Sequence, residues 1–337
     1  MAGAKRRDRV VVVTGASAGV GRAVARAFGQ QGAKVGLVAR TREALDEAAQ
    51  EIERAGGEAL VLPLDVADPA AVAAAADQVV ARWGRIDLWV NDAMVSVFSP
   101  VKEMKPEEYR RVTEVDYLGY VHGTLAALRH MLPRDRGHVI QIGSALVYRS
   151  IPLQSAYCAS KAAIRGFTDS LRCELHHDRS RVKLTKIQLP AVNTPQFDVV
   201  RSRLPNRPQP VPPIYQPEVI ARAVLYAADH PTRELWVGWS TVKAIVGQRF
   251  IPGLLDWYLG RTGYRAQQRP LRARQPPEAR KDDVDRPLPG DRGAHGDFDA
   301  RSKGSSSELW LRTNRRWLAG MVAAAAVGLV GYRALRA

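Results

Sequence analysis

The stretch "VVVVTGASAGVG", residues 10–21, runs from four valines through a glycine-rich turn into a helical pattern. Each glycine has its own use in such a turn. Gly15 permits a sharp bend, Gly19 lets a pyrophosphate approach the backbone, and Gly21 allows close helix–strand packing. Free amide groups and the positive end of the helix then attract phosphate. The stretch predicts a dinucleotide-binding strand–turn–helix, with a plain strand–helix connection as the alternative.

Short apolar runs alternate with helical patterns from this stretch to about residue 260. This alternation predicts one α/β domain, residues 10–260, built as a Rossmann-like, doubly wound parallel sheet. Such sheets bind ligands beyond the carboxyl ends of their strands. The expected strands are Val10–Val13, Lys34–Ala39, Ala59–Leu64, Leu88–Val90, His138–Ile142, Val182–Leu189 and Leu235–Trp239.

Three segments flank this domain. Residues 1–9 are basic, and residues 261–314 are rich in Arg, Pro, Asp, Gly and Ser, which predicts a disordered linker. Residues 315–337 are expected to form a membrane-anchoring helix, because Leu318–Tyr332 carries no charge and lies between Trp317 and Arg333. An alanine-rich helix packed on the main domain is the alternative.

Composition narrows the function classes. The 337 residues carry a formal net charge of +16, but no zinc finger, aromatic RNP-like strand or helix-turn-helix accompanies it, so we expect no specific nucleic-acid partner. The two cysteines stand in no metal-ligand pattern, so no metal is expected. A membrane-associated protein with a cytoplasmic catalytic domain is favoured, and a soluble cytoplasmic protein is the alternative.

A tyrosine and a lysine stand four positions apart in "YCASK", residues 157–161. On a helix, Tyr157 and Lys161 share one face. A nearby ammonium favours the phenolate and is expected to lower the pKa of the tyrosine toward the range useful for acid–base catalysis. An ordinary solvent-exposed pair has the same spacing.

The second expected strand ends in "LVAR", with Ala39 followed by Arg40. An acidic residue near this point binds the ribose 2′-hydroxyl of NAD, whereas an arginine can grip the 2′-phosphate of NADP. Arg40 therefore favours NADP over NAD, with a surface charge as the alternative.

The T-G-x-x-x-G-x-G spacing, with "YCASK" downstream, resembles the short-chain dehydrogenase/reductase family over about residues 8–250. Further matching stretches are "LDV" at 64–66, "NDAM" at 91–94, Ser144, and "LPAVNTP" at 189–195. The resemblance implies hydride transfer at a nicotinamide, with Ser144, Tyr157, Lys161 and Asp116 as catalytic residues. It implies cofactor binding by Gly15, Ser17, Gly19, Val20, Gly21, Arg40, Asp65, Val66, Asn91, Ala93, Tyr157, Lys161 and Thr194.

Three positions depart from the family pattern. Asp116 stands where the family often has asparagine, and Met94 and Ala191 replace glycines. The resemblance also implies a homodimer or homotetramer.

The expected function is NADP-dependent interconversion of a small-molecule alcohol and carbonyl compound. The alternative is a low-activity dinucleotide-binding regulatory protein or a membrane-surface scaffold. Late aromatic residues, including Trp239, Trp257 and Tyr258, form either a wall for a lipophilic substrate or an ordinary core or interface helix.

Overall fold

The computed structural model describes residues 8–269 and 281–315. Its centre is a seven-stranded sheet in the order β11-β7-β6-β4-β1-β2-β3, in which neighbouring strands are parallel. The expected α/β doubly wound fold and its strands are confirmed, with small shifts at the ends. The strands are β1 (Val10–Thr14), β2 (Lys34–Ala39), β3 (Glu58–Pro63), β4 (Leu88–Asn91), β6 (His138–Ser144), β7 (Lys183–Leu189) and β11 (Glu234–Trp236).

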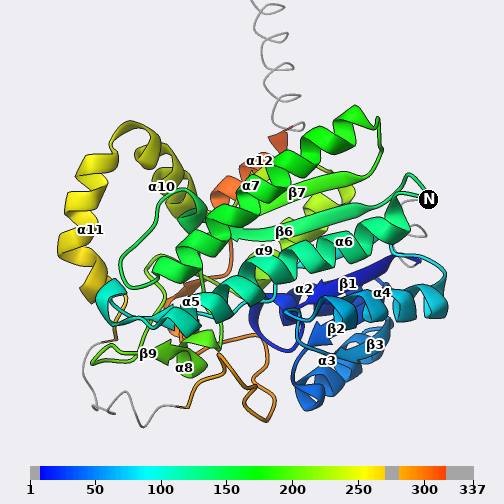
Figure 1. Cartoon of the computed structure of the whole chain (residues 1–337), viewed down its shortest axis with the longest axis horizontal. Coiled ribbons are helices and arrows are strands. Elements are labelled where there is room, and N and C mark those ends of the chain that lie inside the picture. The colour runs from blue at the N-terminus through cyan, green and yellow to red at the C-terminus, as the bar shows by residue number, and fades with distance from the viewer. Residues whose placement is uncertain (1–7, 270–280, 316–337) are drawn as a thin grey trace, which may run out of the picture.

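Helices cover both faces of the sheet (Figure 1). One face packs on α2 (Gly19–Gly29), α3 (Arg42–Arg54) and α9 (Pro217–Asp229). The other packs on α4 (Pro69–Trp83), α6 (Gly119–Met131) and α7 (Ser155–His177), with α5 (Pro106–Thr113) beside them. Strand β1 alternates between the two clusters and is buried throughout, which explains why its four valines are consecutive.

The strand order reverses beside β1. Strand β2 lies on one side of β1 and β4 lies on the other. The connections after β1 and β4 therefore part at the carboxyl ends and leave room for a ligand.

Short elements surround this opening. Helices α10 (Trp239–Phe250) and α11 (Pro252–Ala266) project from one side of the sheet (Figure 1). The others are β5 (Val97–Phe98), β8 (Ala191–Val192), α8 (Gln196–Val199), β9 (Arg201–Ser202), β10 (Ile214–Tyr215), β12 (Ser302–Lys303) and α12 (Ser307–Thr313).

The disordered linker expected at 261–314 disagrees with the structure wherever these residues are described. Helix α11 continues past residue 261, and β12 pairs in parallel with β10. Val284 and Phe298 are buried, and several of the segment's charged groups pair with the domain. Low apolar content misled the prediction, because three of the segment's apolar side chains, Val284, Phe298 and Leu309, are enough to fix it on the core.

The membrane-anchoring helix expected at 315–337 lies, beyond Arg315, outside the described residues. Within residues 8–269 and 281–315, no helix combines the length and the apolar character that crossing a bilayer requires.

A buried polar network joins β4, β6 and α6 beneath the opening. The Asn91 side-chain oxygen accepts a bond from Trp89 Nε1 at 2.8 Å, and its nitrogen donates to Gln141 Oε1 at 2.9 Å. The same nitrogen also donates to Thr124 Oγ1 at 3.2 Å. Asn91 and Trp89 are fully buried, so water cannot replace these bonds.

We predict that Asn91→Leu lowers the free energy of unfolding by about 2–4 kcal/mol, because Trp89 and Gln141 lose partners inside the core. Urea denaturation measures the change. Gln50→Leu on the exposed face of α3 is the control and should change stability by less than about 0.5 kcal/mol. Equal effects of the two substitutions would contradict a structural role for the network.

Candidate active site

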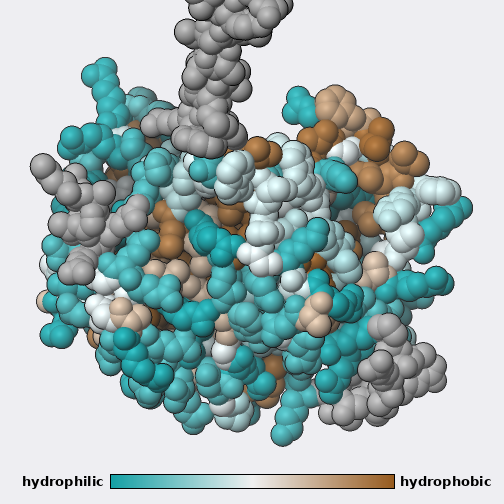
Figure 2. Space-filling model, turned by 180° about the vertical axis from the view of Figure 1, so that it is seen from behind, coloured by the Kyte–Doolittle hydropathy of each residue, from teal (hydrophilic) through white to brown (hydrophobic). Residues whose placement is uncertain are grey.

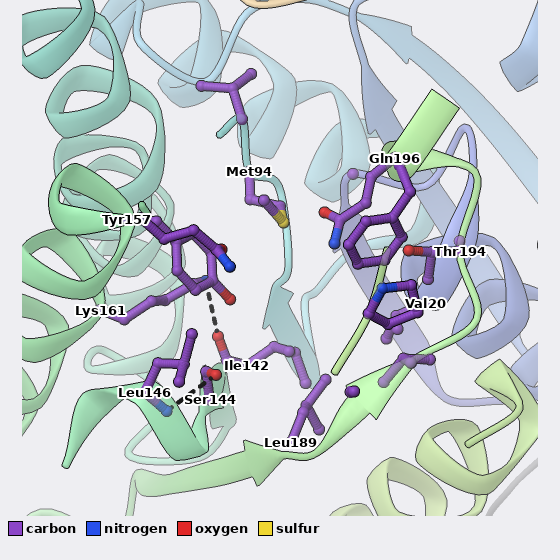
Figure 3. Close-up of a pocket in the computed structure, with 18 of the residues that line it drawn as sticks. Val20, Met94, Ile142, Ser144, Leu146, Tyr157, Lys161, Leu189, Thr194 and Gln196 are labelled. Atoms are coloured by element: carbon purple, nitrogen blue, oxygen red, sulfur yellow. Dashed lines mark hydrogen bonds between the residues drawn. The ribbon is translucent and has the colours of Figure 1, made fainter. Parts of the chain in front are cut away.

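A cavity of about 550 Å³ lies at the carboxyl ends of the strands. Most of the residues singled out from the sequence line it, and Figure 3 shows Tyr157, Lys161 and Ser144 on one side and Val20 and Thr194 on the other. The predicted residues along its wall are Gly15, Ser17, Gly19, Val20, Arg40, Asp65, Val66, Ala93, Ser144, Tyr157, Lys161 and Thr194.

The glycine turn forms one end of the cavity. Gly15 has φ +73°, and a Cβ on it would lie 2.9 Å from the Ala93 backbone. A Cβ on Gly21 would lie 2.2 Å from the Gly15 carbonyl oxygen. Glycine is therefore required at both positions, and α2 begins against the cavity at Gly19, whose amide donates to the Gly293 carbonyl. This close-packed turn fits the pyrophosphate of a dinucleotide.

The expected catalytic side chains come from two elements. Ser144 ends β6, where its hydroxyl accepts a bond from the Leu146 amide at 3.1 Å. Tyr157 and Lys161 lie on one face of α7. The Lys161 ammonium donates to the Tyr120 hydroxyl at 2.8 Å. It also donates to the Ile142 carbonyl at 3.1 Å (Figure 3). These bonds hold the ammonium 5.6 Å from the centre of the Tyr157 ring.

The sequence-based expectation for the Tyr157 pKa differs from the structure. Burial raises the pKa of Tyr157, the Asp116 carboxylate raises it further, and a hydrogen bond with Ser144 opposes them. Burial and the Asp116 charge therefore dominate the pKa of this side chain. The phenol stays protonated at neutral pH, which is the form that can give a proton to a substrate oxygen.

Two carboxyl groups, those of Asp116 and Asp92, lie close enough to interact with the charge of Lys161. Asp116 is fully buried in the short π-helical turn between α5 and α6, and its Oδ1 accepts a bond from the Val95 amide at 2.8 Å. Its Oδ2 has no hydrogen-bond partner among the described residues. Burial raises the pKa of Asp116 to about 7, and it also raises the pKa of Asp92 to about 7. Attraction to Lys161 opposes both increases.

Burial shifts the pKa of the Lys161 ammonium in the opposite direction to that of the two carboxyls. Burial lowers its pKa, while Asp116 and Asp92 work against that change. The lysine thus depends on buried carboxylates to stay charged at the site.

Arg40 lies at the other end of the cavity, as the "LVAR" stretch indicated. Its guanidinium donates to the Asp283 carbonyl at 2.5 Å and to the Val284 carbonyl at 3.2 Å. A guanidinium has five N–H donors, so these bonds leave others for a ligand. Asp65 lies nearby and accepts from Arg111 at 2.5 Å. Burial alone would raise the pKa of Asp65, but hydrogen bonds from the Ala67 amide and from Arg111 hold that pKa below its usual value.

Three predicted site residues do not line the cavity. Gly21 supports the turn from below, and Asp116 lies behind Lys161. Asn91 uses its side chain in the buried network, which corrects its assignment to direct cofactor contact.

Sequence reasoning missed two residues beside Lys161. Tyr120 stands four positions after Asp116 on the same helical run, so that spacing was a usable signal. Asp92 stands in the quoted "NDAM" stretch, but its position near Lys161 depends on the fold.

An apolar wall borders the cavity on the side of α10 and α11. Leu255, Tyr258 and Leu259 line the cavity from α11. Figure 2 shows apolar side chains gathered on the outer surface of these helices, at the upper right. They include the exposed Trp239, Phe250, Leu254, Trp257 and Tyr258, so the aromatic cluster serves both as cavity wall and as surface.

No group of His, Cys, Asp and Glu suited to a metal ion occurs among residues 8–269 and 281–315. The polar groups that line the cavity include a phenol, a hydroxyl, an ammonium and a guanidinium, together with the carboxyls of Asp65 and Asp92. They suit proton transfer beside an anionic nucleotide.

Known proteins resemble the chain in sequence and in structure. The sequence model described as short chain dehydrogenase matches residues 9–204. The chain is 36% identical to the uncharacterized oxidoreductase YxnA of Bacillus subtilis over 277 residues, covering 80% of this chain and 77% of that protein. It is 33% identical to a fatty acyl-CoA reductase of Acinetobacter baylyi over 223 residues, covering 66% and 73%. A metagenomic short-chain oxidoreductase crystallised with NADP superposes with a TM-score of 0.58 at 33% identity, covering 68% of this chain and 96% of that one.

The raised pKa of Asp116 generates a stability prediction. Between the usual value of 3.8 and about 7, the native state holds a proton that the unfolded state has lost, so this carboxyl destabilises the fold increasingly as pH rises through that window. We expect the free energy of unfolding of Asp116→Asn, relative to the unsubstituted protein, to rise by roughly 1–3 kcal/mol between pH 4 and pH 8, on top of a constant loss from removing a charge partner of Lys161.

Denaturant unfolding at several pH values measures this gain. Asp46→Asn, at an exposed position on α3, is the matched control and should show little change at any pH. A difference between the two proteins that stays constant from pH 4 to pH 8 would contradict the buried-carboxylate argument.

Proposed function

The chain belongs to the short-chain dehydrogenase/reductase family, and from this premise we propose that it interconverts an alcohol and a carbonyl compound with NADP as cofactor. One observation carries the proposal. Ser144, Tyr157 and Lys161 meet in the same cavity as the glycine turn and Arg40. A proton donor and a nucleotide-binding end are thus joined by one continuous space.

The protein's own groups have separate roles in this proposal. Tyr157 gives a proton from its hydroxyl to a carbonyl oxygen, or takes one from an alcohol. Ser144 hydrogen-bonds the same substrate oxygen and stabilises the charge that develops there. Lys161 holds the positive charge that favours the phenolate once the proton has left. The bound nicotinamide supplies or accepts the hydride.

The cofactor residues act from opposite ends of the cavity. The amides at the start of α2 would hold the pyrophosphate, and Thr194 would contact the nicotinamide end. Arg40 would contact a 2′-phosphate through N–H donors that the Asp283 and Val284 carbonyls leave available. A structural relative that binds NADP supports this assignment of the cofactor.

The proposed substrate class is lipophilic. Leu255, Tyr258 and Leu259 give the cavity an apolar wall, and a relative is named as a fatty acyl-CoA reductase. The exposed apolar surface of α10 and α11 would suit a membrane face, with residues 315–337 as the anchor and the catalytic domain in the cytoplasm. Leu118, Leu125 and Leu132 are exposed at seven-residue spacing along the helical run of α6, which favours the homodimer or homotetramer.

A second candidate function is nucleotide binding with little turnover. The buried carboxyls of Asp116 and Asp92 favour it, because a negative charge near Tyr157 disfavours the phenolate. Binding of NADPH without oxidation by any carbonyl compound in a broad panel would identify this function.

We predict that Tyr157→Phe lowers kcat by at least about 100-fold and leaves the Kd for NADPH within about twofold, because only the proton-transferring oxygen is lost. NADPH oxidation over long-chain aldehydes and lipophilic ketones, beside calorimetric binding, measures both. Tyr148→Phe is the matched control, since the Tyr148 hydroxyl binds Glu234 outside the cavity. Undiminished turnover in the Tyr157 variant would show that Tyr157 is not the proton-transferring residue.

A second prediction concerns cofactor choice. Arg40→Ala should lower the ratio of the Kd for NADH to the Kd for NADPH by about tenfold or more, because only NADPH carries the 2′-phosphate. The ratio separates this contact from a general loss of nucleotide affinity. Equal weakening of both nucleotides would argue against the 2′-phosphate contact.

A further inference from the structure

Residues 281–299, here called the strap (Figure 1, orange), form part of the cavity wall although they lie outside the matched family segment. Asp283, Leu288, Gly290 and Arg292 of the strap line the same cavity as Tyr157. The strap is therefore part of the wall that surrounds the proposed nucleotide site.

One end of the strap is fixed beside Arg40. The Arg40 guanidinium donates to the carbonyls of Asp283 and Val284, and Arg111 Nε donates to the Val284 carbonyl at 3.0 Å. The Val284 side chain is fully buried and packs in the cluster that contains Val66 and Val115, which also line the cavity. An apolar side chain thus secures the strap at the end assigned to adenosine.

The middle of the strap is fixed at the glycine turn. The Gly19 amide donates to the Gly293 carbonyl at 3.1 Å, and Arg22 pairs with Asp291 at 3.1 Å. Arg22 is itself 1% exposed and belongs to α2. The strap therefore contacts the helix whose first turn faces the pyrophosphate.

The far end of the strap is fixed beside Thr194. Phe298 is 3% exposed and packs edge-on against Phe197, with ring centres 5.8 Å apart. A Cβ on Gly296 would lie 2.5 Å from the Thr194 carbonyl oxygen, so glycine permits this close approach. The strap thus reaches from the adenosine end to the loop assigned to the nicotinamide.

We propose that the strap is a cofactor-binding element that closes over the adenosine and pyrophosphate parts of the bound dinucleotide. The inference rests on the proposed function, since it requires that the cavity hold NADP(H). The fixed strap still leaves about 550 Å³ beneath it, within the range of ~300–1,000 Å³ usual for ligand sites. Arg292 adds a cation to the wall beside this space.

Hydrogen–deuterium exchange with and without saturating NADPH tests the proposal. NADPH should slow exchange at least about fivefold in peptides from the glycine turn, residues 14–24, and from the strap, while α4 stays unchanged. Faster exchange in the strap would show that nucleotide displaces it and would overturn the proposal, as would an unchanged rate. An unchanged glycine turn would instead show that the proposed nucleotide-binding function had failed.

A substitution in the strap tests the same proposal through the affinity for nucleotide. Val284→Ser should raise the Kd for NADPH and for NADH alike by about tenfold, because it loosens the strap without altering Arg40. Val79→Ser on α4 is the matched control, since Val79 is equally buried in the same cluster but lies outside the strap. Unchanged nucleotide affinity in a folded Val284 variant would overturn the proposal.

Discussion

The close contact between two glycines sets the geometry of the whole site. A side chain on Gly21 would collide with the carbonyl of Gly15, and a side chain on Gly15 would collide with the Ala93 backbone. Because neither position carries one, β1, α2 and the loop after β4 meet within van der Waals distance. Every other functional group is placed relative to that meeting point. Ser144 ends the strand next to β4, and Thr194 contacts the same turn at Gly19.

The charge at Lys161 is supported from within the core. Its ammonium is 2% exposed, so water does little to stabilise it. The Tyr120 hydroxyl and the Ile142 carbonyl supply hydrogen bonds, and the carboxyls of Asp116 and Asp92 supply opposite charge. The same carboxyls disfavour ionisation of Tyr157. The site thus has two requirements. Lys161 must stay charged, and in the proposed reaction the Tyr157 phenol must keep its proton until substrate and cofactor change its surroundings.

Local pattern was enough to predict the sheet and the glycine turn, and to single out Ser144, Tyr157 and Lys161, which line one cavity; their catalytic roles stay predictions. Each depends on short-range spacing, such as four consecutive valines in a strand buried on both faces. The direction of the Tyr157 pKa shift could not be predicted from the sequence, because it depends on burial and on which groups bind Lys161. The role of Asn91 was missed for a similar reason, since the residues that bind it come from three separate elements. The segment 261–314 was predicted to be disordered from its composition, which does not reveal that Val284 and Phe298 occupy core positions.

The nucleotide cleft is assembled from segments far apart along the chain. Residues 14–21 form its floor and residues 281–299 form part of its wall, so the first is synthesised long before the second. During translation the sheet can form while the cleft is still open on one side, because the amino-terminal part of a domain emerges first. The wall can therefore be completed only late in biosynthesis, after the carboxyl-terminal third of the polypeptide has been made.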